Sequence, residues 1–364
     1  MAHQDDIIHN MLDDRPISRR DALRRLGLVG GGVAAGGALG TLFDRSIAEA
    51  SERVDTRPYK KNPPWRIGFS NISVVNTWRV QMVAELKYEA SKHPIKQLLI
   101  TDAGGNASKQ ISDIEDLLAK NVDALLVTPT SPDALVPVLT QAYHAGVVII
   151  IFNAKVNTTN YTAFLAADEV EFGKIGGAWL NKQLHGKGNI VALDGIAGNS
   201  VSADRFNGAK SQFGPGIKIL AHQPADWAYD KGKAVMENLL AAYPHIDGIY
   251  SQGGAMSQGA VEAILAANRP LVPITAEGSN GFLKIWAARH LHSIGPDEPT
   301  WQSGLALQLA IKALQGQALA KFVPLPLPTI TDATLHRYVR RDLPDSFWAN
   351  THLPEKVIDQ LYKK

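Results

Sequence analysis

The fold is decided by residues 124–154, ALLVTPTSPDALVPVLTQAYHAGVVIIIFNA, in which two apolar runs of strand length enclose a helical segment. Ser131 is expected to cap this helix and Pro132 to occupy its first position, and Gly146 is expected to end it. The run at 147–154 is apolar at consecutive positions, which is typical of a central strand with both faces buried. A strand, a helix and a strand in this order predict a parallel sheet.

Outward from this unit, strands and helices keep alternating. Further strands are predicted at 66–72, 96–103, 189–195, 217–223, 248–254 and 272–278. Further helices are predicted at 79–91, 107–120, 169–185, 200–212, 229–242, 257–268 and 280–289. Because the alternation runs through both halves, the sequence predicts an α/β protein with two doubly wound parallel-sheet lobes.

Composition narrows the class of protein. The chain has 364 residues, which suits two domains, and its formal net charge of +2 gives no strong preference for nucleic acid. It contains no cysteine, which excludes disulfides, iron–sulfur clusters, Cys-ligated zinc and a thiol nucleophile. The same absence excludes a bacterial lipid anchor, which needs a cysteine at the cleavage point.

The first fifty residues have the features of an export signal. Arg19 and Arg20 precede an apolar run rich in glycine and alanine, and the small residues Ala48 and Ala50 form a cleavage pattern. We interpret residues 1–50 as a twin-arginine signal peptide, which predicts a periplasmic protein.

Two other interpretations of this segment are weaker. A membrane-spanning helix at 25–43 would be long enough, but its glycines lower both helix propensity and hydrophobicity. A DNA-binding helix-turn-helix would lose its recognition helix to the same glycines. The mature chain is therefore expected to begin near Ser51, with a polar leader over 51–64.

Polar and aromatic side chains gather at the ends of the predicted strands, where ligands bind in doubly wound sheets. They are Asn76, Trp78, Asp102, Phe152, Asn153, Arg205, Trp227, Gln252, Glu277 and Asp297. Carboxylates, amides and arginine exchange hydrogen bonds with adjacent hydroxyl groups, and an aromatic face covers the C–H face of a sugar ring. This mixture predicts a hydroxyl-rich ligand.

Each residue also has a purely structural interpretation. Trp78 and Trp227 could each cap the core, Arg205 could be a surface arginine, and Glu277 could cap the helix that starts near residue 280. The recurrence of the same residue types at strand ends in both halves favours a binding site over these separate explanations.

No signature of an enzyme accompanies these residues. The chain has no G-x-x-x-x-G-K-[ST] phosphate loop and no G-x-S-x-G nucleophile turn, and its eleven histidines form no H-E-x-x-H motif. We therefore predict neither catalytic residues nor a metal site nor a cofactor.

Four segments between about Trp65 and Leu335 resemble the type 1 periplasmic sugar-binding proteins, the ribose-binding proteins in particular. They are NVDALLVTPTSPDAL (121–135), IAGNSVSADRFNGA (196–209), HQPADWAYDKGKAVMENLLAAYPHIDGIYSQ (222–252) and AEGSNG (276–281). The third segment is the most specific of the four.

The resemblance implies a role for several residues. The first-loop Asn and aromatic positions of the family fall on Asn76, Trp78 and Arg79, and its binding arginine falls on Arg205. Its aromatic lid falls on Trp227, and its acid after the ninth strand falls on Glu277, where the family usually has Asp. The hinge glutamine of the family has no clean match, and Pro296 or Asp297 stands in its place.

Two departures from the family pattern concern the ligand. Phe152-Asn153 replaces an Asp-Arg pair that many members have, and Gly253-Gly254 replaces an Asn-Asp pair. Polar partners are lost and space is gained at these positions. The departures predict a ligand other than ribose, either larger or less densely hydroxylated.

The resemblance implies lobes joined by a three-strand hinge, with crossovers near Ala166, Glu298 and Thr329. The N-terminal lobe is expected to comprise 65–166 and 298–328, and the C-terminal lobe 167–297 and 329–364. The implied function is capture of a sugar or polyol by hinge closure, followed by delivery to the permease and ATPase of an ABC importer. The protein is expected to be a monomer.

Two other functions stay open on the sequence. One is a sensor that binds a sugar-like cue and docks on a membrane signalling receptor. The other is an enzyme acting on a glycoside, in which Glu277 and Asp297 serve as paired acid and base.

Overall fold

The computed structural model describes residues 52–363 of the chain. The predicted signal peptide, at 1–50, lies outside these residues. Within residues 52–363, no helix combines the length and the apolar character that a membrane span requires.

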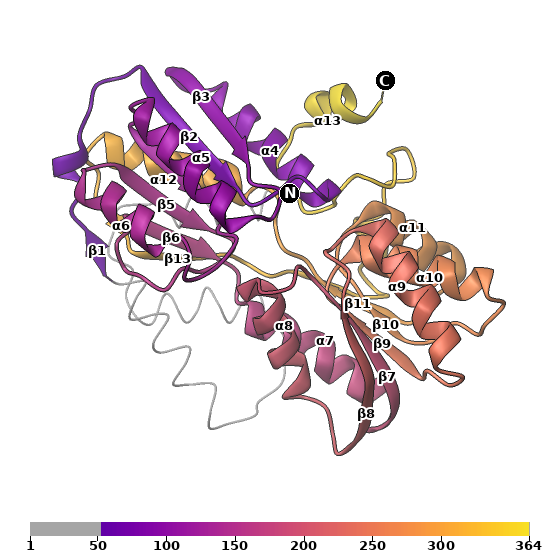
Figure 1. The fold of residues 1–364 in the computed structure, drawn as a ribbon. Helices are drawn as coiled ribbons and strands as arrows, with labels where there is room; N and C mark the ends of the chain where they lie inside the picture. The colour runs from indigo at the N-terminus through magenta and orange to yellow at the C-terminus, as the bar shows by residue number, and fades with distance from the viewer. Residues whose placement is uncertain (1–51, 364) are drawn as a thin grey trace, which may run out of the picture. The chain divides into compact units, whose positions relative to one another are not determined.

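One six-stranded sheet is built mainly from the first half of the described chain (Figure 1). Its strand order is β13 (Phe322–Pro324), β6 (Ala163–Ala166), β5 (Val148–Phe152), β4 (Ala124–Val127), β2 (Trp65–Asn71) and β3 (Ile95–Asp102). All neighbouring strands in this sheet are parallel. Every residue of β5 is buried, as predicted for a central strand. We call this sheet and its helices the N-terminal lobe.

Helices cover both faces of this sheet (Figure 1). The helices are α4 (Thr77–Ala90), α5 (Ala107–Ala119), α6 (Val136–His144) and α12 (Gln302–Leu314). Alternate residues of the strands, such as Leu125 and Ile149, form a buried cluster with Ile114 of α5 and Leu139 of α6. Helices α4 and α12 pack against each other, and α12 also packs on β4 and β5.

The second six-stranded sheet has the order β14 (Thr329–Ile330), β11 (Ser293–Pro296), β10 (Ile274–Thr275), β9 (Gly248–Ser251), β7 (Lys187–Asp194) and β8 (Gly216–Pro224). Its strands are parallel except for β14, which pairs antiparallel with β11. Its helices are α7 (Glu169–Gln183), α8 (Ser200–Lys210), α9 (Tyr229–Ala242), α10 (Gly254–Ala266) and α11 (Asn280–Arg289). We call this part the C-terminal lobe.

Alternate side chains of strand β7 pack against the helices on opposite faces of the sheet. Ile190 and Ala192 pack with Leu180 of α7 on one face of the sheet. Val191 and Leu193 belong to a separate cluster on the other face, which includes residues of α9, α10 and α11. Because successive side chains of a strand point to opposite faces, one apolar strand anchors both layers. The predicted α/β class with two doubly wound parallel-sheet lobes is confirmed.

The chain passes between the two sheets three times, after β6, after β11 and after β13. These passages lie near Ala166, Glu298 and Thr329, where crossovers were predicted. The residue limits proposed for the lobes stay a prediction.

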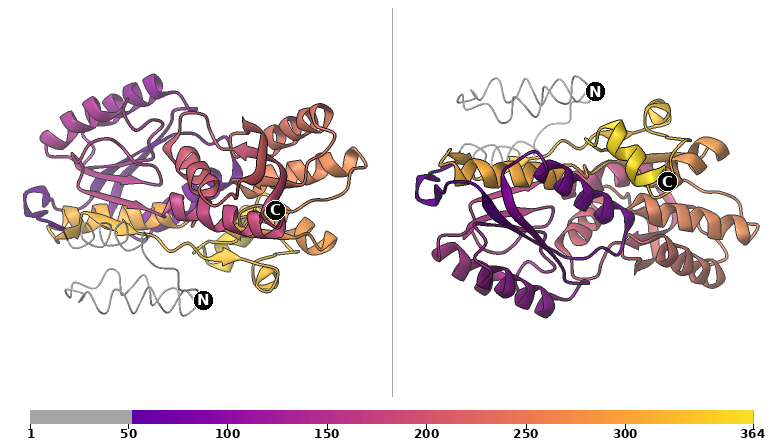
Figure 2. Two further views of the ribbon diagram at one scale, coloured as in Figure 1. Left: turned by 90° about the horizontal axis from the view of Figure 1, so that it is seen from below. Right: turned by 90° about the horizontal axis from the view of Figure 1, so that it is seen from above.

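The C-terminal segment contacts both lobes, and it lies at their junction in Figure 2, where it is yellow. The Trp348 N–H donates to Gln81 of α4 at 2.9 Å, and the Ala349 N–H donates to the Gly278 carbonyl at 2.9 Å. The last helix, α13 (Glu355–Tyr362), packs with Ala84 and Tyr88 of α4. This segment, predicted to belong to the C-terminal lobe, therefore also packs on the N-terminal lobe.

The predicted start of the helix in 124–154 is wrong. The Ser131 hydroxyl does accept the N–H groups of residues 133 and 134, at 3.3 and 3.4 Å. A turn follows, and helix α6 begins only at Val136, with Pro137 in its first turn. A proline fits this position because the first N–H groups of a helix have no partner within the helix.

Candidate functional site

Arg205 is the centre of a buried ion-pair network in the C-terminal lobe. It lies on α8, whose first turn is capped by Asn199, and its side chain is only 2% exposed. Its Nε donates to Glu169 Oε2 at 2.6 Å, and its Nη1 donates to Glu277 Oε1 at 3.2 Å and to the Gln252 carbonyl at 2.9 Å. The guanidinium also lies over the ring of Phe172 at 3.6 Å. A guanidinium suits this position because its donors spread in a fixed plane.

A second group of polar side chains comes from the N-terminal lobe. Arg79 Nη2 donates to Asn153 Oδ1 at 2.5 Å, and Asn153 Nδ2 donates to Glu298 Oε1 at 2.8 Å. Asn153 follows β5 with a φ of 69°, a left-handed conformation that Asn tolerates better than most residues. Gln302, at the start of α12, also donates to Glu298 Oε1, at 3.0 Å.

Glu298 joins these two groups, since its other carboxylate oxygen accepts from Arg205 Nη2 at 2.8 Å. A continuous chain of hydrogen bonds therefore runs from α4 of one lobe to α8 of the other. We call the buried set the polar cluster; its members are Arg79, Asn153, Glu169, Arg205, Glu277, Asp297, Glu298 and Gln302. Asp297 belongs to it because it precedes Glu298 and accepts the Gly278 N–H at 2.9 Å, next to Glu277.

Burial dominates the electrostatics of the cluster. It is the main reason why the pKa of Glu277 is raised to about 8 and that of Asp297 to about 7, and the nearby charge of Glu298 acts in the same direction on both. It also raises the pKa of Glu169 and lowers the pKa of Arg79 to about 10. Burial alone would lower the pKa of Arg205, but the pairing with Glu169, Glu277 and Glu298 outweighs it and raises this pKa. The polar cluster thus contains more carboxylates than guanidinium groups to pair with them.

These shifts predict that the free energy of unfolding falls as the pH rises. The unfolded chain loses the protons of Glu277 and Asp297 near pH 4, whereas the folded chain keeps them up to about pH 7 to 8. Between these values the unfolded state binds fewer protons, so stability decreases with pH and levels off above about pH 8. Asp297→Asn is expected to flatten the profile between pH 5 and pH 8 by on the order of a few kcal/mol. Denaturant unfolding at pH 5 and at pH 8 measures this change in the free energy of unfolding.

Asp359→Asn is the matched control, because Asp359 is exposed on α13. Its profile is expected to follow that of the wild type. An Asp297→Asn profile as steep as the wild-type one would contradict the assignment of a raised pKa to Asp297.

Several polar atoms of the cluster have no hydrogen-bond partner among the described residues. They are Arg79 Nη1, Glu169 Oε1, Asp297 Oδ2 and Gln302 Oε1. A buried polar atom without a partner costs about 1–3 kcal/mol, and more when it is charged. One of these atoms is a donor and the others are acceptors. Hydroxyl groups can bind both kinds, because each hydroxyl group donates one hydrogen bond and also accepts.

Trp227 lies beside this cluster, with a φ of 54°, in the turn between β8 and α9. Its ring rests on two glycines: a Cβ added to Gly195 would come within 2.0 Å of the ring, and one added to Gly253 within 2.8 Å. Its Nε1 is buried without a partner among residues 52–363. The space expected at Gly253 from the missing side chain is therefore occupied by Trp227, so this departure does not by itself enlarge the site.

Three other predicted residues border the cluster. Trp78 Nε1 donates to the Glu298 carbonyl at 3.1 Å, and Asn76 caps α4 by accepting the Arg79 N–H at 2.9 Å. Gln252 donates to Asp194 at 2.7 Å and offers its carbonyl to Arg205. All three side chains are buried. The Asn76 side chain binds the backbone of Arg79, the Trp78 ring lies 5.1 Å from the Arg79 guanidinium, and the Gln252 backbone carbonyl binds the Arg205 guanidinium.

Two predicted residues lie apart from the cluster. Asp102 is exposed, and its carboxylate accepts the Gly104 N–H at 2.9 Å within a turn. Phe152 is fully buried, and its ring packs against that of Phe69 with centroids 5.5 Å apart. In the structure, Asp102 shapes a loop and Phe152 fills the core.

The sequence reasoning missed Glu169, Glu298 and Gln302. Glu169 is the first residue of a helix after a crossover, and Glu298 follows Asp297 directly. Asp194 was also missed, although it ends strand β7 and Gln252 donates to it. Extending the inspection of strand ends to the crossovers would have found the two glutamates.

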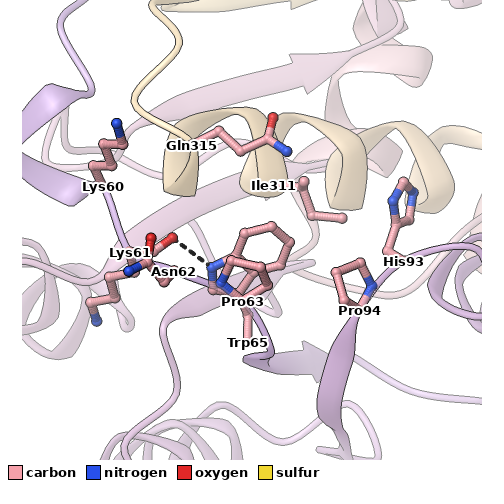
Figure 3. Close-up of a pocket in the computed structure, with 9 residues that line it drawn as sticks. All are labelled: Lys60, Lys61, Asn62, Pro63, Trp65, His93, Pro94, Ile311 and Gln315. Carbon is pink, nitrogen blue, oxygen red and sulfur yellow. Dashed lines mark hydrogen bonds between the residues drawn. The ribbon is translucent and has the colours of Figure 1, made fainter.

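A surface pocket lies elsewhere in the N-terminal lobe (Figure 3). It is lined by Lys60, Lys61, Asn62, Pro63, Trp65, His93, Pro94, Ile311 and Gln315. Trp65 begins strand β2, so the pocket lies near the amino ends of the strands. The polar cluster lies at their carboxyl ends. Within residues 52–363, no three His, Asp or Glu side chains are arranged to hold a metal ion.

Comparison with known proteins gives a consistent picture. A family model described as a periplasmic binding protein domain matches residues 67–318. The chain is 31% identical over 262 residues to the ribose import binding protein of Bacillus subtilis, covering 72% of this chain and 85% of that protein.

Solved structures are similar over most of their length. The crystal structure of a galactofuranose-binding protein has a TM-score of 0.71 and 26% identity, covering 76% of this chain and 97% of that one. The fructose-binding periplasmic domain of a hybrid two-component system has a TM-score of 0.69 and 26% identity, covering 75% and 93%.

Proposed function

Because this chain belongs to the periplasmic binding protein family, we propose that it captures a small sugar or polyol between its two lobes and delivers it to an ATP-driven importer. The observation that carries the proposal is the polar cluster, to which both lobes contribute. Hydrogen bonds that need both lobes favour the closed arrangement, so a ligand that adds to them shifts the population toward closure. No chemical change of the ligand is required.

The ligand class is supported by the leftover polar atoms and by Trp227. Arg79 Nη1 and Trp227 Nε1 are buried donors without partners among the described residues, and Glu169 and Asp297 each have a free acceptor oxygen. A compound with several hydroxyl groups can satisfy both kinds. The indole ring would cover an apolar face of that compound. We place the ligand between Arg79, Arg205 and Trp227.

The importer is supported by the relatives, one of which is named a ribose import binding protein. We expect the protein to act in the periplasm as a monomer, with a permease and an ATPase as its partners.

A signalling receptor is the second candidate, because a similar solved structure is the periplasmic domain of a hybrid two-component system. Uptake of labelled ligand separates the two functions. Cells lacking the gene are expected to lose uptake if the protein serves an importer and to retain it if the protein serves a sensor.

A thermal-shift screen of protein starting at Ser51 tests the ligand class. The compounds are pentoses, hexoses, polyols, cyclitols and, as the contrasting class, amino acids. A ligand at 100 times its Kd adds about 2.7 kcal/mol of stability, which shifts the melting temperature visibly. A sugar or polyol response supports the proposal, and a response confined to amino acids contradicts the ligand class.

Trp227→Ala is expected to weaken binding of the screened ligand about 10-fold, because truncating an aromatic contact in a closed site typically costs more than 1 kcal/mol. Calorimetry measures the Kd. Trp179→Ala is the control, since Trp179 packs with the α7 and α8 cluster, away from the polar cluster. It should lower stability and leave the Kd unchanged. An unchanged Kd for Trp227→Ala would contradict a ligand contact.

Export by the twin-arginine route is proposed from residues 19 and 20. The double variant Arg19→Lys and Arg20→Lys is expected to leave uncleaved precursor in the cytoplasm, because this pathway reads the arginine pair. Cell fractionation measures the distribution. Normal export of the variant would contradict the route while leaving the binding function untouched.

A further inference from the structure

The polar cluster contains more negative than positive groups. Its carboxylates are those of Glu169, Glu277, Asp297 and Glu298, and its guanidiniums are those of Arg79 and Arg205. When all are ionised, two negative charges are in excess. Within residues 52–363, Arg205 is the cationic side chain paired with these carboxylates, and it pairs with three of them.

Among the described residues, Asp297 is the one carboxylate of the polar cluster that has no cationic partner within ion-pair distance, whereas Glu169, Glu277 and Glu298 pair with Arg205. It is fully buried, one oxygen accepts the Gly278 N–H at 2.9 Å, and the other oxygen has no partner among the described residues. Glu169 also retains one free oxygen, although its other oxygen is 2.6 Å from Arg205. Buried charges are costly unless they are both paired and hydrogen-bonded. Both oxygens therefore lack a hydrogen-bond donor, and the Asp297 carboxylate also lacks a paired positive charge among the described residues.

A neutral hydroxyl group supplies a donor to such an oxygen but leaves the excess charge in place. An ammonium group supplies up to three donors and one positive charge. Charge-assisted hydrogen bonds are roughly twice as strong as neutral ones. An ammonium group on the ligand would thus neutralise one of the two excess negative charges of the polar cluster.

We propose that the ligand is an amino sugar or amino polyol, whose protonated amine lies against Asp297 while its hydroxyl groups contact Arg79 and the free oxygen of Glu169. This inference rests on the proposed function, because it assigns a ligand to the same site. An inorganic cation is disfavoured, since no set of metal-ligating side chains is present within residues 52–363. Burial raises the pKa of Asp297 to about 7, which supports the need for a cation there.

Matched pairs of compounds test the inference by calorimetry at pH 7 and constant ionic strength. The pairs are glycerol with 2-amino-1,3-propanediol, sorbitol with 1-amino-1-deoxysorbitol, glucose with glucosamine, and galactose with galactosamine. In at least one pair the amine is expected to bind at least 10-fold more tightly than its hydroxyl counterpart. Asp297→Asn should reduce that preference to less than 3-fold, and Asp359→Asn should preserve it.

The outcomes distinguish a wrong ligand class from a wrong binding function. If the hydroxyl compound binds more tightly in every pair that binds, the inference is wrong and the proposed function stands. If no member of any pair binds, and sugars and polyols also fail in the wider screen, the proposed function fails as well. If K⁺ or Ca²⁺ alone stabilised the protein, a metal ion would account for the excess negative charge, and this result would contradict the inference.

A wild-type measurement covers the case in which Asp297→Asn does not fold. Calorimetry in two buffers of different ionisation enthalpy counts the protons released on binding. The amine should release more protons than its hydroxyl counterpart, because it displaces protons from the carboxylates. Equal proton counts for the two would contradict the inference.

Discussion

Arg205→Ala is expected to lower the free energy of unfolding by about 3–5 kcal/mol and to weaken ligand binding at least 100-fold. Removing the guanidinium leaves Glu169, Glu277 and Glu298 buried without their common partner, and breaking a buried ion pair on one side costs about this much. Ligand affinity falls as well because a desolvated charge partner is lost from the site. Denaturant unfolding and calorimetry measure the two effects.

Arg289→Ala is the matched control, since Arg289 is exposed at the end of α11. It should change stability by less than about 0.5 kcal/mol. The loss in Arg205→Ala should also be smaller at pH 5 than at pH 8, because burial raises the pKa of Glu169 and of Glu277, and protonation then removes their charge. A loss independent of pH, or a loss no larger than the control's, would contradict the role of Arg205 as the centre of the cluster.

Glu298→Gln is expected to weaken ligand binding about 10- to 100-fold. Glu298 accepts hydrogen bonds from Arg205 at 2.8 Å, Asn153 at 2.8 Å and Gln302 at 3.0 Å, and all three partners are donors. A glutamine must direct its NH₂ group at one of them, which breaks a charge-assisted hydrogen bond worth about 1.5–3 kcal/mol. The broken bond lies on the connection between the lobes, so closure becomes less favourable. Calorimetry of the wild type and the variant measures the change.

Glu237→Gln, at an exposed position on α9, is the control and should leave the Kd unchanged. An unchanged Kd in Glu298→Gln would show that the contact between lobes through Glu298 does not contribute to binding. A changed stability with an unchanged Kd would assign Glu298 a structural role only.

The fold could be predicted because it follows from local patterns. Strand β5 is apolar at every position, and such a run is compatible with burial on both faces, which a parallel sheet between helical layers provides. The start of helix α6 could not be placed by the same reasoning. Ser131 forms the hydrogen bonds of a capping residue, but the chain uses them in a turn, and both Pro132 and Pro137 fit the start of a helix.

The site could be predicted only in part because its pairings are long-range. Arg205 and Asn153 were recognised as strand-end residues, but nothing local to either shows that Glu298 joins them. Trp227 illustrates the same limit. Its place on Gly195 and Gly253 depends on three loops meeting, so Gly253 suggested open space where the structure has an indole ring.

The charge excess also became visible only in the structure. Asp297 and Glu277 are separated by nineteen intervening residues in the chain, yet Asp297 binds the N–H of the residue that follows Glu277. A sequence pattern does not tell whether two such acids are solvated or share a buried site. Burial decides this, and burial is a property of the folded chain.

A small ligand is expected to close the two lobes on each other. Because the chain has no cysteine, spin labels can be placed at Ser108→Cys on α5 and Glu237→Cys on α9 without further changes. The distance distribution between the labels, measured by pulsed electron resonance with and without the ligand from the screen, tests this closure. Saturating ligand is expected to narrow the distribution and to move it to shorter distances, and Arg205→Ala is expected to abolish this change. A ligand that binds the wild type while leaving the distribution unchanged would contradict the closure of the lobes.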